Sequence, residues 1–467
     1  MRGTRRAALL SWTTVRITDL ILSAFDFAAE NRRNAVQFAT DPDSRAKVQE
    51  FLKRALELLS PLLIALTAFT ASAAVPRSIE PPADIQRNQL ATEEIKVRLQ
   101  SVAPSFSISG IGLRFPGSPE RKSGLYQALQ VSWERDSSGL YSWSIKDRDS
   151  GALVQKFKAR QLEVVGSQLR INLKPVAGRL TLIPKSGAEV RTEVIVTLDL
   201  EEYLRGVLPA EMPKDWPLEA LKAQAIASRS YALYRKRARE KAGASHHVES
   251  TVMDQVYRSL DADLASVHEN IQRAIRETEG MILVSTRDLA SPLAAYFHSD
   301  CGGHTEDARI VWGEASAGTA ACPHSSSSEW KAEFTLAEIE SRVSARLKRS
   351  GRGSALMGLE PLGRTSSGRV ENIRLVWSDG EEVLMSSHVF RMTLGHDRVR
   401  STNFRLTTVG ENRIQIAGHG SGHGVGLCQW GARHLALNGK SFREILKHYY
   451  PNSVLVTPTT MTTAQLN

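Results

Sequence analysis

The sequence predicts an α+β protein, in which a mainly β N-terminal region is followed by a mixed α+β domain. Three observations lead to this prediction. Between residues 95 and 200, short runs of alternating apolar and polar residues are separated by Gly, Ser, Pro and Asp, a pattern typical of strands. Residues 215–240 have the Ala-, Leu-, Lys- and Gln-rich composition of a helix. From residue 264 onward, helix-like and strand-like runs alternate.

The N-terminal region is predicted to be mostly β because its strand-like runs follow one another closely. Turn-forming residues bound each run, which favours short strands over helices. The runs cover residues 95–102, 106–115, 127–133, 141–147, 169–176, 179–185 and 193–200.

The strongest predicted helix covers Asp215–Glu240. Asp215 can cap its N-terminus, and Pro217 suits the first turn. Residues 220–227 carry one charge in eight positions, so we expect this part of the helix to be buried on most sides.

The remaining elements are predicted from the same local signals. Helices are expected at 264–279, 335–348, from 432 onward and at 442–451, and strands at 281–286, 292–299, 370–377, 381–386 and 404–409. The glycines at 418–424 make a helix unfavourable, so a loop or strand edge is expected there.

A targeting signal is predicted near the N-terminus. The basic pair at 53–54 precedes the apolar run 58–74, which has the length of a signal-peptide core and is short for a membrane span. The residues Ala-Ser-Ala at 71–73 fit the small-x-small cleavage rule, so the mature chain would start at Ala74. An uncleaved anchor or a buried helix is the alternative.

The chain is therefore expected to be exported to the periplasm, the cell wall or the outer face of the cytoplasmic membrane. It would contact a membrane only if the signal segment stays uncleaved. Because 52 residues precede Lys53, we expect translation to begin downstream, for instance at Val48 or Leu52. The predicted parts are an extension with the signal peptide (1–73), a linker (74–93), a β-rich region (94–193), the mixed domain (194–457) and a tail (458–467).

Composition and charge narrow the class of partner. The 467 residues include 42% hydrophobic and 24% charged residues, which is ordinary for a soluble globular protein. A formal net charge of +10 favours an anionic partner such as an acidic wall polymer. The chain has no run of five or more basic residues, so we expect no nucleic-acid partner.

Glu211 is the candidate general acid, because it lies between a strand-like segment and the helix that starts near Pro217. The dipole of that helix would favour the charged carboxylate. Burial by Met212, Pro213 and Trp216 would instead raise its pKa, as a general acid requires. A helix-capping glutamate is the alternative interpretation.

Two further candidates, Arg229 and Tyr231, lie on the second half of the same predicted helix. They can orient a ligand. The alternative is structural, with Arg229 in a buried ion pair and Tyr231 as a core aromatic.

A cluster of His and Cys predicts a metal site. His298, Cys301 and His304 are separated by two residues on each side, and Cys322 lies 18 residues further on. Two nitrogens and two sulfurs suit tetrahedral zinc. A Cys301–Cys322 disulfide and a catalytic cysteine–histidine pair are the alternatives. His324 can replace one of the two histidines.

The stretch 418–434, "GHGSGHGVGLCQWGARH", carries three histidines on a glycine-rich backbone. Glycines permit close approach of the backbone to a ligand, and His419 and His423 can then bind it. A simple turn is the alternative, but it leaves the "QWGA" that follows unexplained.

Three segments together resemble the stage II sporulation protein D (SpoIID) family. They are "LEEYLRGVLPAEMPKDWPLEALKAQAIASRSYALY", "DQVYRSLDADLASVHENIQRAIRETEGMILV…AAYFHSDCGGHTEDARIVWG" and "GHGSGHGVGLCQWGARHLALNGKSFREILKHYYPN". They occur in the order and spacing of that family. The resemblance covers roughly Val194 to Leu455 and implies that this part is a SpoIID-like catalytic domain.

The resemblance implies a peptidoglycan lytic transglycosylase. Such an enzyme cleaves between N-acetylmuramic acid and N-acetylglucosamine without water, on glycan stripped of its peptides, and leaves a 1,6-anhydro end. The family's catalytic glutamate, in its "EMP" element, corresponds to Glu211. One carboxyl group suffices for this reaction, because it protonates the leaving oxygen and then accepts the proton of the attacking hydroxyl. No cofactor is required for the chemistry.

The resemblance also gives roles to the other candidates. His423 and Gln429 can hydrogen-bond sugar hydroxyls, and Trp430 can stack on a sugar ring or fill the core. Some relatives contain structural zinc, which favours the metal interpretation of the His/Cys cluster. An alternative function is that of a non-catalytic wall-binding protein that enhances a cell-wall amidase. A metallohydrolase built on the His/Cys cluster is a more remote alternative.

Overall fold

The computed structural model describes residues 93–115, 126–135, 139–187, 189–259, 269–314, 318–322, 329–349, 353–410 and 412–456. Over these residues the α+β prediction is confirmed, with a strand-rich N-terminal part. The predicted signal segment and the C-terminal tail lie outside them. Within the described part of the chain, no helix combines the length and apolar character needed to cross a membrane.

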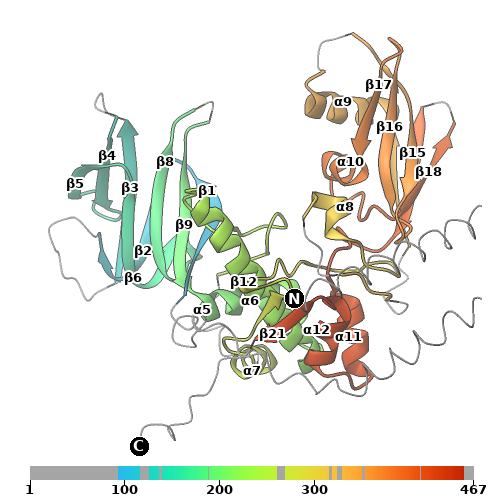
Figure 1. Ribbon diagram of the computed structural model, residues 1–467. Helices are drawn as coiled ribbons and strands as arrows, with labels where there is room; N and C mark the ends of the chain where they lie inside the picture. The colour runs from blue at the N-terminus through green and yellow to red at the C-terminus, as the bar shows by residue number, and fades with distance from the viewer. Residues whose placement is uncertain are drawn as a thin grey trace, which may run out of the picture. The chain divides into compact units, whose positions relative to one another are not determined.

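One ten-stranded sheet forms the N-terminal part (Figure 1). Its strand order is β10-β1-β9-β8-β6-β2-β3-β4-β5, with β7 added at β6, and all pairs are antiparallel except β1 with β10. The strands are β1 (Glu94–Val102), β2 (Ser105–Arg114), β3 (Tyr126–Arg135), β4 (Tyr141–Asp147), β5 (Leu153–Ala159), β6 (Leu162–Ile171), β7 (Lys174–Pro175), β8 (Arg179–Lys185), β9 (Arg191–Asp199) and β10 (Val248–Glu249).

Six of the seven predicted runs in this region correspond to single strands, and the predictions missed β5, β10 and most of β6. The run 169–176 is divided between β6 and β7 by a tight turn, in which Asn172 and Leu173 have positive φ. The sheet continues through β9 and β10, beyond residue 193. The boundary between the β-rich region and the mixed domain, expected at 193, stays a prediction. Because β10 pairs with β1, it ties the start of the segment 248–259 to the sheet.

Helix α5 (Leu200–Glu211) follows β9 directly and was not predicted. The Asp199 side chain caps it by accepting a hydrogen bond from the Glu202 N–H, and Pro209 lies in its last turn. The predicted long helix is α6 (Leu218–Lys241), and it is largely buried from Ala220 to Leu233, as expected. Its N-cap is Pro217, without a side-chain hydrogen bond, so the prediction that Asp215 caps it is wrong.

The other elements of residues 269–314 and 427–456 are short. They are α7 (Glu269–Glu277), β11 (Ile282–Ser285), β12 (Asp288–Pro292), β13 (Phe297–His298), α8 (Ala308–Trp312), β20 (Leu427–Cys428), α11 (Gln429–Leu437), α12 (Phe442–Tyr449) and β21 (Ser453–Val456). Of these, α7, β11, β12, α11 and α12 pack against α6. The predicted strand 292–299 is mostly wrong. The N–H groups of Ala295 and Tyr296 bond to carbonyls two residues earlier, so the backbone turns where a strand was expected.

Residues 329–419 build a second hydrophobic cluster of their own, centred on residues such as Trp330, Ile373 and Phe390. Two three-stranded sheets, β15-β16-β17 and β14-β19-β18, pack here with two helices. The elements are β14 (Glu329–Thr335), α9 (Leu336–Leu347), β15 (Leu356–Arg364), β16 (Val370–Trp377), β17 (Glu382–Ser386), α10 (Ser387–Leu394), β18 (Phe404–Val409) and β19 (Arg413–His419).

Candidate functional site

The Glu211 carboxyl group is held by two segments that are distant in sequence. Glu211 is the last residue of α5 and is partly buried. Its Oε1 accepts a hydrogen bond from the Val256 N–H at 2.7 Å, and its Oε2 accepts one from the Gln429 side-chain amide at 3.3 Å. Gln429 is buried as the first residue of α11, so the carboxyl group has a defined orientation.

The surroundings raise the pKa of Glu211. Burial is the larger influence, and the hydrogen bonds from Val256 and Gln429 partly oppose it by stabilising the carboxylate. The prediction that Glu211 precedes a helix N-terminus is incomplete, because the residue ends α5. The C-terminal end of a helix dipole disfavours a negative charge, so this position also favours the protonated acid.

Two aromatic residues lie near these groups in the sequence, Trp216 five residues after Glu211 and Trp430 one residue after Gln429. Trp430 is 38% exposed. Its ring meets that of Trp216 edge-on, with centroids 5.1 Å apart. The Arg433 guanidinium lies 5.5 Å from the Trp430 ring centroid and 5.8 Å from that of Trp216. An exposed indole next to a tuned carboxyl group suits a ligand with both an apolar face and hydroxyl groups.

The glycine-rich stretch is an irregular loop between β19 and β20, as predicted. Gly420, Gly422, Gly424 and Gly426 all have positive φ, between 73° and 110°. A Cβ at Gly426 would overlap the Tyr296 carbonyl oxygen. These glycines therefore let the loop pack closely against the chain itself.

His423 contributes to the site as a neutral imidazole. Its Nδ1 accepts a hydrogen bond from the Val425 N–H at 3.1 Å, so the ring proton is on Nε2. Burial and nearby positive groups keep the pKa of His423 well below its usual value. Its ring lies 4.9 Å from that of Trp312 and 6.1 Å from that of Tyr296, measured between centroids.

His419 ends β19, and its backbone is held on both sides. The His419 N–H donates to the Asn403 carbonyl, and its own carbonyl accepts from the Ser401 hydroxyl. Its role as a ligand-binding residue stays a prediction.

Arg229 is completely buried in an ion pair, which is the structural alternative considered from the sequence. Its guanidinium donates two hydrogen bonds to the Glu201 carboxylate, at 2.7 and 2.8 Å, and one to the Met281 carbonyl. With no exposed surface, its side chain stabilises α6 against α5 and cannot contact a ligand in this structure. Tyr231 is also buried, and its hydroxyl donates to Asp254 Oδ1 at 2.8 Å.

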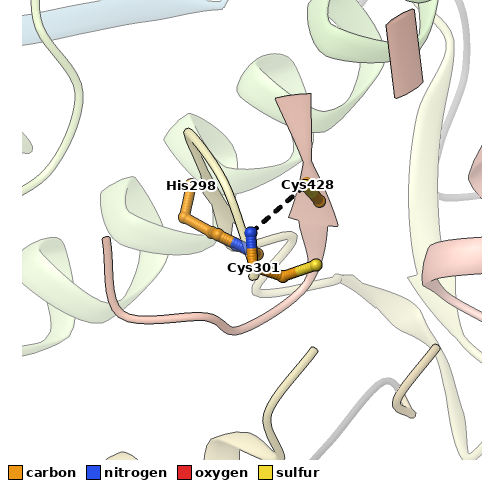
Figure 2. Close-up of side chains that lie close together, drawn as sticks. All are labelled: His298, Cys301 and Cys428. Atoms are coloured by element: carbon orange, nitrogen blue, oxygen red, sulfur yellow. Dashed lines mark hydrogen bonds between the residues drawn. The ribbon is translucent and has the colours of Figure 1, made fainter. Parts of the chain in front are cut away.

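A buried cluster brings together His298, Cys301 and Cys428, whose ligand atoms all lie within 4.8 Å of one another (Figure 2). His298 Nδ1 bonds to the Val425 carbonyl at 3.0 Å and must therefore donate. Its buried Nε2 has no hydrogen-bond partner among the residues that the structure describes. The Cys301 N–H donates to Cys428 Sγ at 3.3 Å, shown as the dashed line in Figure 2.

Cys322 adds a third thiol to this cluster. It interacts with the Cys301 and Cys428 thiols, and its Sγ lies 3.1 Å from the Tyr449 hydroxyl. The neighbouring thiols lower the pKa of Cys301, and all three cysteines are free. One imidazole nitrogen and three sulfurs are a donor set that fits tetrahedral zinc, and the His298–carbonyl bond is the usual way to orient such a ligand.

His304 is not part of this cluster, so the predicted ligand set needs correction. Its Nδ1 donates to the adjacent Thr305 carbonyl, and the structure does not group its ring with the cysteines. Cys428 takes the ligand position that was expected for His304. The reason is that the parallel pairing of β13 with β20 puts His298 beside Cys428. His324 lies outside the described residues.

A cavity of about 140 Å³ was not predicted from the sequence. Its lining comes from six separate segments of the chain, and no local motif links them. The lining residues are Tyr231, Val252, Met253, Asp254, Tyr296, Phe297, Trp312, His388, Arg391, Met392 and His423. Of these residues, only Tyr231 and His423 were named as candidate site residues from the sequence.

Comparisons with known proteins identify a matching family model and several similar proteins. The SpoIID family model, described as stage II sporulation protein, matches residues 188–284, and a domain of unknown function matches residues 319–426. An uncharacterized protein of Brachyspira hyodysenteriae is 35% identical over 58% of this chain and 70% of its own length. Stage II sporulation protein D of Bacillus amyloliquefaciens is 30% identical over 55% of this chain and 74% of its own length. The amidase enhancer of Bacillus subtilis is 26% identical over 54% of this chain and 40% of its own length.

Proposed function

Because this chain belongs to the stage II sporulation protein D family, we propose that it is a lytic transglycosylase acting on the glycan strands of peptidoglycan. The observation that carries the proposal is Glu211, a partly buried carboxyl group with a raised pKa beside an exposed indole. The proposed substrate bond joins N-acetylmuramic acid to N-acetylglucosamine in glycan stripped of its peptides.

Glu211 would act twice in the reaction. As the protonated acid, it donates its proton to the glycosidic oxygen as the bond to the anomeric carbon breaks. As the carboxylate, it then accepts the proton of the muramic acid C6 hydroxyl while that oxygen bonds to the anomeric carbon. The products are a free hydroxyl end and a 1,6-anhydro end, and Glu211 is protonated again. The hydrogen bonds from Val256 and Gln429 stabilise the carboxylate formed between the two steps.

Four side chains, those of His298, Cys301, Cys322 and Cys428, are proposed to hold a structural zinc ion. The unpartnered His298 Nε2 and the lowered pKa of Cys301 support this assignment. The cluster is adjacent in the chain to the proposed catalytic group, because Cys428 directly precedes Gln429, whose side-chain amide donates a hydrogen bond to Glu211. The ion would fix this part of the loop and take no part in the proton transfers.

The proposed site of action is outside the cytoplasm, with peptidoglycan as the partner. The similarity to a protein named amidase enhancer supports a second candidate function, in which the chain binds the wall and stimulates a cell-wall amidase. The transglycosylase releases anhydro ends, whereas the enhancer need not cleave glycan at all. One experiment can therefore separate the two functions.

That experiment incubates the purified protein with amidase-treated peptidoglycan and analyses the soluble products by mass spectrometry. We expect fragments that end in 1,6-anhydro-N-acetylmuramic acid. A folded protein that binds the glycan and releases no anhydro ends would contradict the transglycosylase. Stimulation of an added amidase by that same protein would then support the enhancer.

Replacing Trp430 by Ala is expected to weaken glycan binding about fivefold to tenfold, the loss of roughly 1–1.4 kcal/mol of stacking and contact. The indole is exposed beside Glu211, so the change removes ligand contact with little loss of core packing. Binding of peptide-stripped glycan fragments by calorimetry measures the effect. Leu437→Ala, an exposed position on the same helix, is the matched control and should bind normally. Equal affinity in the two variants would show that Trp430 does not contact the glycan.

A further inference from the structure

Aromatic rings and residues of helix α10 line the unpredicted cavity. The Trp312 and Tyr296 rings stack with centroids 4.4 Å apart, and the His423 ring meets Trp312 edge-on. His388 and Arg391 project from α10. The volume of about 140 Å³ is close to that of an engineered cavity of roughly 150 Å³ that holds one benzene molecule. The cavity therefore has room for a small ring or a ring substituent.

Arg391 is the unusual group in this cavity, because it is a buried cation for which the described part of the chain shows no anionic partner. The residue is only 7% exposed, and its Nε has no hydrogen-bond partner within the described ranges. The one hydrogen bond that the structure shows for its guanidinium goes to the Met392 sulfur, at 3.6 Å. A buried arginine normally has a carboxylate or several carbonyl oxygens around it.

The acid in the cavity lining does not neutralise Arg391. Asp254 already accepts hydrogen bonds from the Tyr231 hydroxyl and the Glu249 N–H, and it forms an ion pair with Arg235 at 2.9 Å. Burial and the charge of Arg369 lower the pKa of Arg391 to about 10, which leaves it protonated at neutral pH.

The two histidines of the lining are neutral and can donate hydrogen bonds without adding charge. Burial lowers the pKa of His388 to about 4, and its buried Nδ1 has no hydrogen-bond partner in the described part of the chain. His423 carries its ring proton on Nε2, as its bond from Val425 requires. The cavity thus contains one uncompensated positive charge and hydrogen-bond donors beside two stacked aromatic rings.

We propose that this cavity binds a carboxylate carried on the glycan strand, namely the free carboxyl group of a peptide-stripped muramic acid, with Arg391 as its counter-ion. The identity of the strand rests on the proposed function, whereas the preference for a carboxylate rests on the cavity alone. When a peptide is attached, this carboxyl group is part of an amide and carries no charge. The site would therefore distinguish stripped from peptide-bearing glycan.

The cavity lies close enough to Glu211 for one strand to reach both. Asp254 lines the cavity, and Val256, two residues later, donates to Glu211. Two residues span at most about 7 Å of chain. On the other side, β13 contributes Phe297 to the cavity, and its partner strand β20 leads directly into Gln429. Two short segments thus connect the carboxylate site to the acid.

The test compares three glycan fragments on the full chain that carries Glu211→Gln, so that none is consumed. They are a peptide-stripped fragment, the same fragment with its carboxyl groups converted to carboxamides, and a peptide-bearing fragment. We expect the stripped fragment to bind about 10- to 100-fold more tightly than the carboxamide, the range for hydrogen bonds to a charged group. The peptide-bearing fragment should bind as weakly as the carboxamide.

Variants then assign the preference to Arg391. Arg391→Gln should bring the stripped and carboxamide fragments to within about twofold of each other, and Arg391→Lys should restore part of the difference. Arg405→Gln removes the charge of a 70%-exposed arginine on β18 and should leave the preference unchanged. Arg391→Gln should stay folded, since it removes a buried charge for which the described residues show no partner. If it does not fold, the three fragments on the chain with native Arg391 still decide.

Three results would overturn the proposal: equal binding of the stripped and carboxamide fragments, an unchanged preference in folded Arg391→Gln, or equally tight binding of the peptide-bearing fragment. The last would place the carboxylate on the peptide. Release of anhydro ends by the unsubstituted chain is scored separately. Cleavage without a carboxylate preference would leave the proposed function intact and contradict this inference. A carboxylate preference without release of anhydro ends would support the carboxylate site and contradict the proposed function.

Discussion

Glu211→Gln is expected to lower the release of 1,6-anhydro ends by about 10²- to 10⁴-fold, the usual contribution of general acid–base catalysis. Glutamine keeps the size of the side chain and an oxygen that can accept the Val256 N–H, but it cannot donate and recover a proton. Glycan binding should persist, because the indole and the cavity are unchanged. Mass spectrometry of amidase-treated peptidoglycan gives the product yield, and sedimentation with insoluble glycan gives binding.

The stability of this variant provides an internal control. The pKa of Glu211 is raised in the folded protein, so the folded chain binds the proton more tightly than the unfolded chain does. The stability contributed by this group is present at low pH and is lost as the pH rises through the folded-state pKa. Above that folded-state pKa, the ionised, partly buried carboxylate therefore lowers the free energy of unfolding. Glu211→Gln should unfold at the same temperature as the wild type or at a higher one.

The pH dependence follows from the same shift. Activity needs the protonated acid at the start, so the rate should fall as the pH rises through the raised pKa of Glu211. Glu202→Gln, on the same helix and 39% exposed at its side chain, is the matched control and should keep both rate and profile. Full activity in a folded Glu211→Gln protein would show that another group supplies the proton.

Cys428→Ser is expected to remove bound zinc and to lower the free energy of unfolding by about 4 kcal/mol, the linkage value when free metal exceeds its Kd about 1,000-fold. Cys301→Ser should behave alike, since both thiols belong to the same cluster. Loss of the ion leaves buried thiols and the unpaired His298 Nε2 without a common partner. Zinc content by atomic spectroscopy and thermal unfolding with and without a chelator measure the two effects.

His304→Ala separates this ligand set from the one expected from the sequence. Its ring lies outside the cluster, so the variant should retain zinc and thermal stability. Titration of the denatured, chelated protein should detect all three cysteines as free thiols. A single free thiol would instead indicate a Cys301–Cys322 disulfide, and zinc loss in His304→Ala would contradict the corrected set.

Much of the fold could be predicted from the sequence because its signals are local. Period-two alternation marked the strands around 95–200, and composition marked the buried half of α6. The helix expected at 335–348 is α9, with the Thr335 hydroxyl as its N-cap. The family was recognisable for a similar reason, since its motifs are contiguous stretches that keep their order. Helix α5 was missed because Pro209 and the adjoining strand-like run masked its pattern.

By itself, the sequence determined the α+β class, most of the strands and the family, because each follows from neighbouring residues. Only the tertiary structure decided which side chains meet. The pairing of β13 with β20 joins Cys428 to Cys301, 127 residues earlier in the chain, and Arg229 finds Glu201 across two helices. No periodicity encodes such contacts, because they depend on the packing of whole elements. The same packing buries Arg391, and the described residues place no carboxylate beside it. A buried charge without a partner is costly, which makes Arg391 a candidate group for binding an anion.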